Sequence, residues 1–255
     1  MTFTINAACG SFIGMGRSNN EDNFFFNKKH LQIPNKGMKN PIKCSIVTDD
    51  PVVFAVFDGM GGERKGEEAA CLSAEIFSSE YKKLEELAVS GKAFMYECCE
   101  KANAAVNRLR RDMQLSAIGS TVAAVYLSQD EIVACNIGDS KIFRIRNKQM
   151  IQISEDHTDE KIMSAIGIKK KPVLLQYIGI PDTEMAIEPY VSKGVLESGD
   201  IYVLCSDGIT DVIEAADMYK IIGDLSADEA AKQLLSEVER RNGADNATAI
   251  VIKIA

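Results

Sequence analysis

Residues 120–153 read STVAAVYLSQDEIVACNIGDSKIFRIRNKQMIQI, and this stretch decides the fold class. It contains four runs rich in β-branched and other apolar residues, at 120–127, 131–137, 141–146 and 150–153. Each connection between successive runs is three residues long. Because a parallel crossover needs about a dozen residues or more, we expect these four strands to be antiparallel neighbours.

Strands and helices are expected on both sides of this stretch. Further strand-like runs cover residues 52–57, 200–205 and 247–254. Apolar residues three and four positions apart predict four helices, at residues 66–83, 91–112, 211–222 and 227–241. Ser226 is the expected N-cap of the last helix, with Glu229 at the capping-box offset. Helices that come in pairs between strands are not the strict alternation of a Rossmann or barrel fold, so we predict an antiparallel α+β architecture.

Two segments carry weaker signals. Residues 28–50 and 158–199 look irregular, but neither has the composition of a linker, and no internal repeat is present. We therefore expect residues 1–255 to form a single domain.

Composition narrows the classes of function. The chain has 255 residues, a formal net charge of −8 and 46% hydrophobic residues, as expected of a globular protein. An acidic chain without a basic block predicts no nucleic-acid partner. The only two histidines are His30 and His157, which argues against His-rich zinc sites and a Ser-His-Asp triad.

Cysteine usage and hydropathy indicate the compartment. The seven cysteines form no C-x-x-C pair, so we expect buried free thiols in a reducing cytosol. No stretch resembles a signal peptide and no run approaches 18 apolar residues. These features predict a soluble, cytoplasmic protein without a membrane partner.

Acidic residues stand at the boundaries of separate hydrophobic runs. They are Glu21, Asp22, Asp58, Asp139, Asp207 and Asp245. A single Asp-Gly, such as Asp58-Gly59 or Asp207-Gly208, is usually only a turn. Its repetition favours a cluster of acids at one rim of the sheets, which would attract Mg²⁺ or Mn²⁺ because these cations prefer oxygen ligands. Arg17, four residues before Glu21, is placed to bind a phosphate through its guanidinium fork.

Seven motifs in order resemble those of the metal-dependent serine/threonine protein phosphatases of the type 2C (PPM) family, and closely those of its compact bacterial members. They are RSNNED at 17–22, FDGMGG at 57–62, GST at 119–121, NIGDS at 136–140, EDHT at 155–158, CSDGITD at 205–211 and DNAT at 245–248. The resemblance covers practically the whole chain. It implies a four-layer α-β-β-α sandwich, with two mainly antiparallel sheets flanked by helices.

The resemblance also implies two Mn²⁺ or Mg²⁺ ions. Asp58 would bridge them, and the carbonyl of Gly59 would bind one. Asp207 and Asp245 would complete the other site.

Further residues have implied roles around these ions. Glu21 and Asp22 would act partly through metal-bound waters, and Asp139 with Asp207 would hold a third, weaker metal. Arg17 would bind the phosphate. Residues 158–199 would include a flap concerned with substrate selection.

Three positions depart from the family pattern or extend it. Met60 stands where many eukaryotic members have a histidine proposed as general acid, a substitution that bacterial relatives share. Lys141 replaces the usual arginine after Gly-Asp-Ser, which keeps the charge but loses the planar fork. Lys169–Lys171 is a basic run within the flap region and is expected to be solvated.

The activity implied is hydrolysis of phosphoserine and phosphothreonine in proteins, without a covalent intermediate, with Arg17, Asp58 and Asp207 as the catalytic residues. We expect a monomer that acts on phosphorylated proteins, together with a cognate serine/threonine kinase. The chain has no C-x5-R, D-x-D or P-loop motif, which argues against other phosphohydrolase chemistries. Two alternatives remain open: a non-catalytic regulatory module of the same fold, and a metal phosphohydrolase for small phosphate esters.

Overall fold

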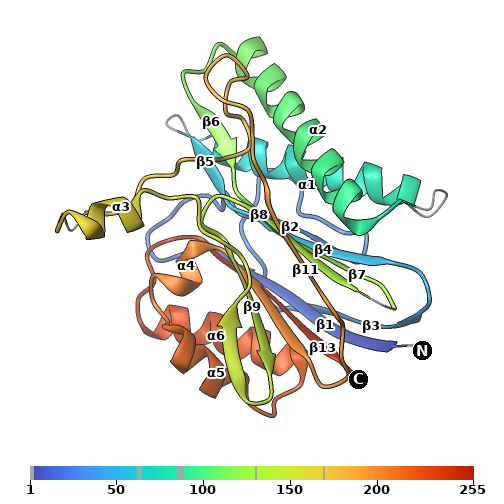
Figure 1. The fold of residues 1–255 in the computed structure, drawn as a ribbon. Coiled ribbons are helices and arrows are strands. Elements are labelled where there is room, and N and C mark those ends of the chain that lie inside the picture. Colours follow the sequence, from blue (N-terminus) through green and yellow to red (C-terminus); the bar gives the residue numbers. More distant parts are fainter. Residues whose placement is uncertain (1–2, 62–64, 85–88, 130, 169) are drawn as a thin grey trace.

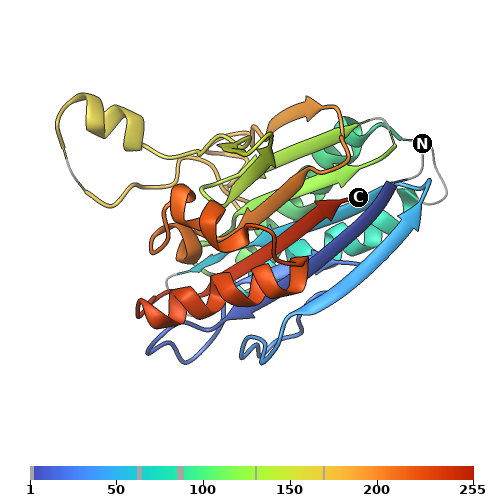
Figure 2. The same cartoon turned by 90° about the horizontal axis from the view of Figure 1, so that it is seen from below.

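The computed structural model describes residues 3–61, 65–84, 89–129, 131–168 and 170–255. Two antiparallel sheets face each other, and helices cover the outer face of each (Figures 1 and 2). The predicted α+β, four-layer architecture is therefore confirmed.

One sheet has six strands. Their order is β10 (Gln149–Gln152), β9 (Lys141–Arg146), β12 (Ile201–Cys205), β13 (Ala247–Ile254), β1 (Phe3–Phe12) and β3 (Ile42–Thr48). The short helix α4 (Asp207–Thr210), α5 (Ala215–Ile222) and α6 (Ala227–Arg240) lie on its outer side.

The other large sheet has five strands. Their order is β11 (Tyr190–Gly194), β8 (Ile132–Ile137), β7 (Val122–Leu127), β4 (Val52–Phe57) and β2 (Asn23–Phe26). Helices α1 (Gly66–Leu84) and α2 (Gly91–Asp112) cover it. A small two-stranded ladder joins β5 (Gly59–Gly61) to β6 (Ile118–Ser120), and α3 (Glu160–Ala165) projects from the body (Figure 2). None of the helices in the described ranges is long and apolar enough to cross a membrane.

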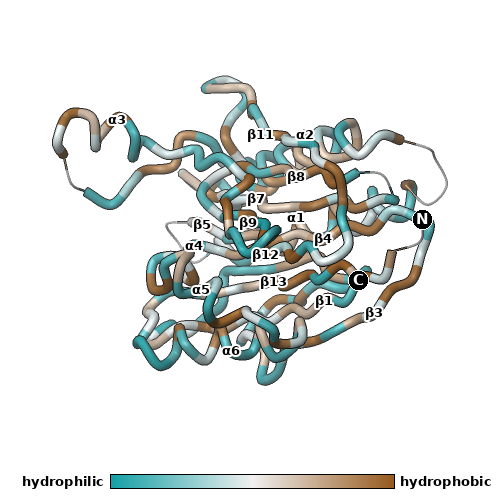
Figure 3. Tube along the Cα trace, turned by 60° about the horizontal axis from the view of Figure 1, so that its bottom comes forward, coloured by the Kyte–Doolittle hydropathy of each residue, from teal (hydrophilic) through white to brown (hydrophobic). Residues whose placement is uncertain are grey.

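Three hydrophobic layers hold the sandwich together, and β4 shows how. Val52, Phe54 and Val56 point into the layer between the sheets, whereas Val53 and Phe57 pack beneath α1 and α2. This alternation follows from the two-residue period of a strand. A third layer lies between the six-stranded sheet and α4–α6. The hydrophobic stretches accordingly follow the strands at the centre of the molecule (Figure 3).

The prediction of four successive antiparallel neighbours is wrong at one junction. β7 pairs with β8 and β9 pairs with β10, but β8 and β9 belong to different sheets. The chain crosses between the sheets at Gly138, whose φ of +94° is accessible because glycine has no Cβ. This crossing carries Asp139 to the junction of the two sheets.

Other boundaries differ where tertiary contacts override local pattern. The helix expected at 211–222 begins only at Ala215, because Glu214 is extended (φ −66°, ψ 152°) and forms an interruption between α4 and α5. The interruption lets Ile209 and Ile213 both lie fully buried in the helix-side layer. The region 28–50, expected to be irregular, contains the edge strand β3. The predicted capping box is present, since the backbone N–H of Ser226 donates to Glu229 Oε2 at 3.0 Å.

Candidate active site

The acids predicted from the sequence leave the strands at one end of the sandwich. Asp58 follows β4, whose last residue pairs with the first residue of β2. Asp207 follows β12, and Asp245 precedes the antiparallel β13, so both lie at the same end of the six-stranded sheet. Asp139 lies in the crossing that connects the two sheets. The end of the six-stranded sheet that carries Asp207 and Asp245 is therefore next to the end of the other sheet that carries Asp58.

Close backbone packing around Gly59 sets the position of Glu21. The Gly59 N–H donates to the Glu21 carbonyl oxygen at 3.2 Å. A Cβ at Gly59 would lie 2.5 Å from that oxygen and would also clash with the Gly66 carbonyl at the start of α1. Only glycine therefore lets β5, α1 and the Glu21 loop meet. Met60 pairs with Gly119 across the small ladder, and Gly62 lies outside the described residues.

Thr121 connects the turns that carry Asp58 and Asp139. Its Oγ1 accepts a hydrogen bond from the Asp58 N–H at 3.0 Å and shares another with Ser140 Oγ at 2.7 Å. Its own N–H donates to the Asp58 carbonyl oxygen at 2.8 Å. Thr121 and Ser140 are buried, so the two acidic turns have a common, rigid anchor.

Asp22 is the most deeply buried of the six acids, with 1% of its surface exposed. Ser206 Oγ donates to its Oδ2 at 2.7 Å, whereas its Oδ1 has no hydrogen-bond partner among the described residues. Burial, followed by the charges of Asp207 and Asp245, raises the pKa of Asp22 to about 7, against the opposing effect of hydrogen bonds. A buried carboxylate oxygen without a partner is energetically costly unless a cation is bound to it.

The pKa values of the neighbouring acids are raised for the same physical reasons. Burial, then Asp22, Asp207 and Asp139, raises the pKa of Asp58 well above its usual range. The Asp58 and Asp207 carboxyl groups act on each other, and burial also raises the pKa of Asp207. Asp139 reaches a pKa of about 6 through burial and the charge of Asp207, with Lys141 opposing. Burial and Glu67 raise the pKa of Glu21.

Arg17 and Lys171 each form an ion pair with an acid of this cluster. Arg17 Nη2 lies 2.6 Å from Asp245 Oδ1, and Arg17 Nε donates to the Ala244 carbonyl oxygen at 3.3 Å. Lys171 Nζ lies 3.8 Å from a carboxylate oxygen of Asp207 and 3.8 Å from one of Asp211. Lys169, the first residue of the basic run, lies outside the described residues.

The donor set fits hard divalent cations in its chemistry. It consists of carboxylate and carbonyl oxygens, and the raised pKa values show that the cluster lacks positive charge. In the described ranges, however, no three His, Cys, Asp or Glu side chains are arranged as a group that could hold a metal ion. The carboxylates are turned instead towards Ser206, Arg17 and Lys171.

A buried hydroxyl and amide network supports Asp22 and was not predicted. Ser11 Oγ and Thr248 Oγ1 lie 2.8 Å apart, and Asn20 Nδ2 donates to Ser11 Oγ at 2.8 Å. Ser206 Oγ accepts from the Thr248 N–H at 2.9 Å while it donates to Asp22. The available sequence signal was the small polar residues next to the acids within the motifs.

Asn246 is a second residue that sequence reasoning left without a role. Its Oδ1 accepts the Glu21 N–H at 2.9 Å, and its Nδ2 donates to the Ile13 and Asn19 carbonyl oxygens. Asn246 thus joins the loop before β13 to the loop that carries Glu21.

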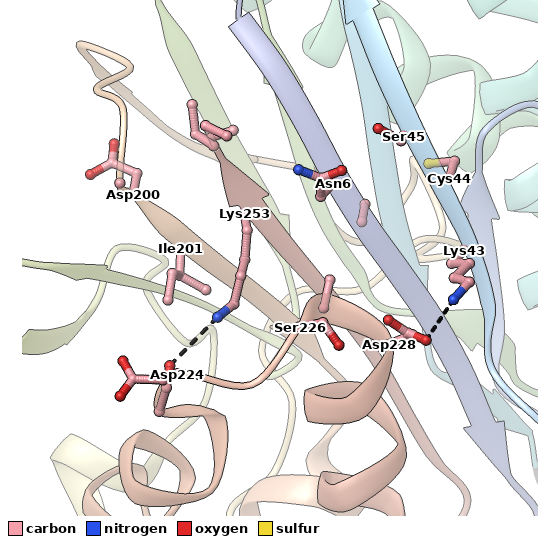
Figure 4. Close-up of a pocket in the computed structure, with 16 residues that line it drawn as sticks. Asn6, Lys43, Cys44, Ser45, Asp200, Ile201, Asp224, Ser226, Asp228 and Lys253 are labelled. Carbon is pink, nitrogen blue, oxygen red and sulfur yellow. Dashed lines mark hydrogen bonds and ion pairs between the residues drawn. The ribbon is translucent and has the colours of Figure 1, made fainter.

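A cavity of about 760 Å³ lies at the opposite end of the strands (Figure 4). It is lined by the last residues of β13 and by the turn between α5 and α6, including Lys253, Asp224 and Ser226. Lys43 pairs there with Asp228 at 2.8 Å. This cavity contains none of the six predicted acids, so it is separate from the candidate active site.

Comparisons with known proteins agree with this architecture. The sequence pattern of the family Protein phosphatase 2C matches residues 42–251. The serine/threonine phosphatase stp of Listeria innocua is 25% identical over 218 residues, covering 80% of this chain and 85% of that protein. A putative protein phosphatase 2C-type of Streptococcus pyogenes is 27% identical over 253 residues and covers 94% of each.

Solved structures share the fold. The serine/threonine phosphatase PstP/Ppp of Mycobacterium tuberculosis has a TM-score of 0.80 at 22% identity, over 98% of each chain. The catalytic domain of PstP in complex with 2 manganese ions has a TM-score of 0.81 at 22% identity, over 100% of each chain. Because the family pattern spans most of the sequence, the chain belongs to the protein phosphatase 2C family, the PPM-type serine/threonine protein phosphatases, and resembles its bacterial members.

Proposed function

We propose that this protein hydrolyses phosphoserine and phosphothreonine in proteins with the help of a dinuclear Mn²⁺ or Mg²⁺ centre. The observation that carries the proposal is the cluster of Asp22, Asp58, Asp139 and Asp207, whose raised pKa values mark a site built for added positive charge. The manganese-bound PstP domain, which has the same fold, supports the choice of metal.

Asp58 and the carbonyl of Gly59 would hold the metals together with Asp207 and Asp245, and Asp139 with Asp207 would hold a third ion. Two divalent cations supply Lewis-acid charge and an acidified water for attack on phosphorus. Glu21 is held by its backbone contacts with Gly59 and Asn246 and would act near the metals.

Arg17 would bind the substrate phosphate. In the described structure it pairs with Asp245, and Asp245 is one of the proposed ligands. With a cation held by Asp245, the Arg17 guanidinium would be available to hold two phosphate oxygens and orient the phosphorus for in-line attack. Met60 has no proton to donate, so the leaving oxygen must be protonated by another group.

The experiment is hydrolysis of para-nitrophenyl phosphate and of phosphopeptides with Mn²⁺, with and without excess chelator. Chelator, Asp58→Asn and Asp207→Ala should each abolish turnover. Thermal unfolding should show both variants folded, because removing a charge from an overcrowded acid cluster does not weaken the metal-free fold. Turnover that persists in chelator, or is unchanged in Asp58→Asn, would refute the metal mechanism.

The two alternative functions are separated by two further measurements. A non-catalytic module predicts no Mn²⁺ binding by calorimetry, whereas the proposed ligands Asp58, Asp207 and Asp245 are all present in this chain. A phosphohydrolase for small molecules predicts faster hydrolysis of nucleotides or sugar phosphates than of phosphopeptides.

The wider setting is also part of the proposal. We propose that residues 1–255 act as one catalytic domain and as a monomer, because every proposed site residue comes from this chain. The substrates would be phosphoproteins produced by a serine/threonine kinase. All seven cysteines are free thiols and six are buried, which supports a reducing compartment such as the cytoplasm.

A further inference from the structure

A projecting arm lies next to the acid cluster and has little packing of its own. We define the flap arm as the described residues 158–168 and 170–175, which contain α3 (Figure 2). No side chain of α3 is buried, and Ile162, Ile166 and Ile168 are all exposed. Elements with few buried contacts move at low free-energy cost.

The base of the flap arm is held by backbone hydrogen bonds. The Leu175 N–H donates to the His157 carbonyl oxygen at 2.8 Å, and the Asp159 N–H donates to the Val173 carbonyl oxygen at 3.1 Å. The Val173 N–H donates in turn to Asp159 Oδ1 at 2.8 Å. These bonds join the two sides of the arm to each other and do not tie it to the acid cluster, and Lys161 pairs with Glu155 at 2.9 Å beside the base of the arm.

Lys171 connects the flap arm to the acid cluster. Its ammonium lies 3.8 Å from carboxylate oxygens of both Asp207 and Asp211, which belong to the body of the protein. The adjacent Lys170 differs, since it pairs at 2.8 Å with Asp159 inside the arm. The chain therefore offers neighbouring lysines of which one bridges arm and body and the other does not.

A divalent cation bound to Asp207 would compete with the Lys171 ammonium for the same carboxylate. Asp207 is a proposed metal ligand, so this inference rests on the proposed function in that respect. Asp207, Asp211, Asp245 and Asp139 all raise the pKa of Lys171, which shows that its ammonium lies in the field of the whole cluster. A divalent cation on Asp207 would replace that attraction with repulsion.

We propose that Lys171 is a latch: in the metal-free protein it holds the flap arm against Asp207 and Asp211, and metal binding at Asp207 expels it and releases the arm. Metal occupancy and arm position are then linked. By reciprocity, a variant with a weakened latch binds metal more tightly.

The first test is calorimetric titration of the metal-free 255-residue protein with MnCl₂, comparing wild type, Lys171→Gln and Lys170→Gln. Lys171→Gln should bind Mn²⁺ about two- to fivefold more tightly, the range expected for loss of an exposed ion pair. Lys170→Gln should match wild type. High salt should reduce the difference, because it screens the latch.

The second test reads the arm directly, by hydrogen exchange of residues 158–175 without and with Mn²⁺. In wild type and Lys170→Gln, Mn²⁺ should speed exchange in the arm. In Lys171→Gln, exchange should already be fast without metal and should not respond to it.

The outcomes separate the latch from the proposed function. Wild-type Mn²⁺ binding with no change in affinity or exchange in Lys171→Gln overturns the latch and leaves the phosphatase proposal intact. Weaker Mn²⁺ binding by Lys171→Gln also overturns it, because Lys171 would then support the loaded state. Failure of wild type to bind Mn²⁺ overturns both.

Discussion

Replacement of Asp22 by asparagine should stabilise the metal-free protein at neutral and alkaline pH. Asp22 is buried, one of its oxygens has no hydrogen-bond partner among the described residues, and its pKa rises from 3.8 to about 7 on folding. Asparagine keeps the shape and an acceptor for the Ser206 hydroxyl, but it carries no charge to bury.

The magnitude and its sign follow from linkage. A carboxyl whose pKa is higher in the folded chain favours folding while it is protonated, and this contribution is lost as the pH rises from about 4 through about 7. Each pKa unit corresponds to about 1.4 kcal/mol, so ionised Asp22 costs the fold up to about 4 kcal/mol. Asp22→Asn avoids that cost, and its advantage over wild type should grow between pH 4 and pH 8.

The assay is urea unfolding in excess chelator across this pH range. Asp217→Asn is the matched control of opposite sign, because its hydrogen bonds with Lys220 and Arg241 lower the pKa of Asp217. That variant should lose stability at neutral pH. In Mn²⁺ the stability advantage of Asp22→Asn over wild type should shrink or reverse, since bound metal stabilises the intact site. A pH-independent difference, or an Asp22→Asn variant less stable than wild type at pH 8 in chelator, would refute the reasoning.

Three further variants or reagents test other parts of the structure. Gly59→Ala should destabilise the protein by about 1–3 kcal/mol in urea unfolding, because its Cβ would overlap the Glu21 and Gly66 carbonyls. Arg146→Ala should cost about 3–5 kcal/mol by leaving Asp200 buried without its 2.6 Å partner, and kcat of the folded fraction should be unchanged because the pair lies at the far end of β9 and β12. A thiol reagent such as DTNB should label the folded protein slowly, since burial raises the pKa of the Cys9 and Cys205 thiols and raises that of the half-buried Cys44 to about 11.

Elements with a strong local pattern were predictable. The helix expected at 91–112 is α2 with the same bounds, and the strands at 52–57 and 247–254 are β4 and β13. In contrast, β1 was missed because it is built largely from small residues, of which Ala8, Cys9 and Gly10 are buried in sequence without alternation.

The gathering of the acids at one rim of the sheets was predictable, but the contacts around them were not. Acids that end separate strands were expected at one rim, and strand register brings Asp58, Asp139 and Asp207 to the same end. The partners of those acids come from residues distant in sequence, such as Ser206 beside Asp22 and Lys171 beside Asp207. No local spacing encodes such contacts, so they required the fold. The ligand roles of the acids stay predictions.

The residues of the proposed site come from both sheets, which the chain connects at Gly138. Asp58 extends from β4 of one sheet and Asp207 from β12 of the other. Their separation is therefore governed by the thickness of the layer between the sheets, where the side chains of Phe54 and Leu204 are fully buried. A change in side-chain volume in that layer would alter the spacing of the ligands without touching any of them. Substitutions in this buried layer should therefore change the metal preference of the proposed site although they lie away from its ligands.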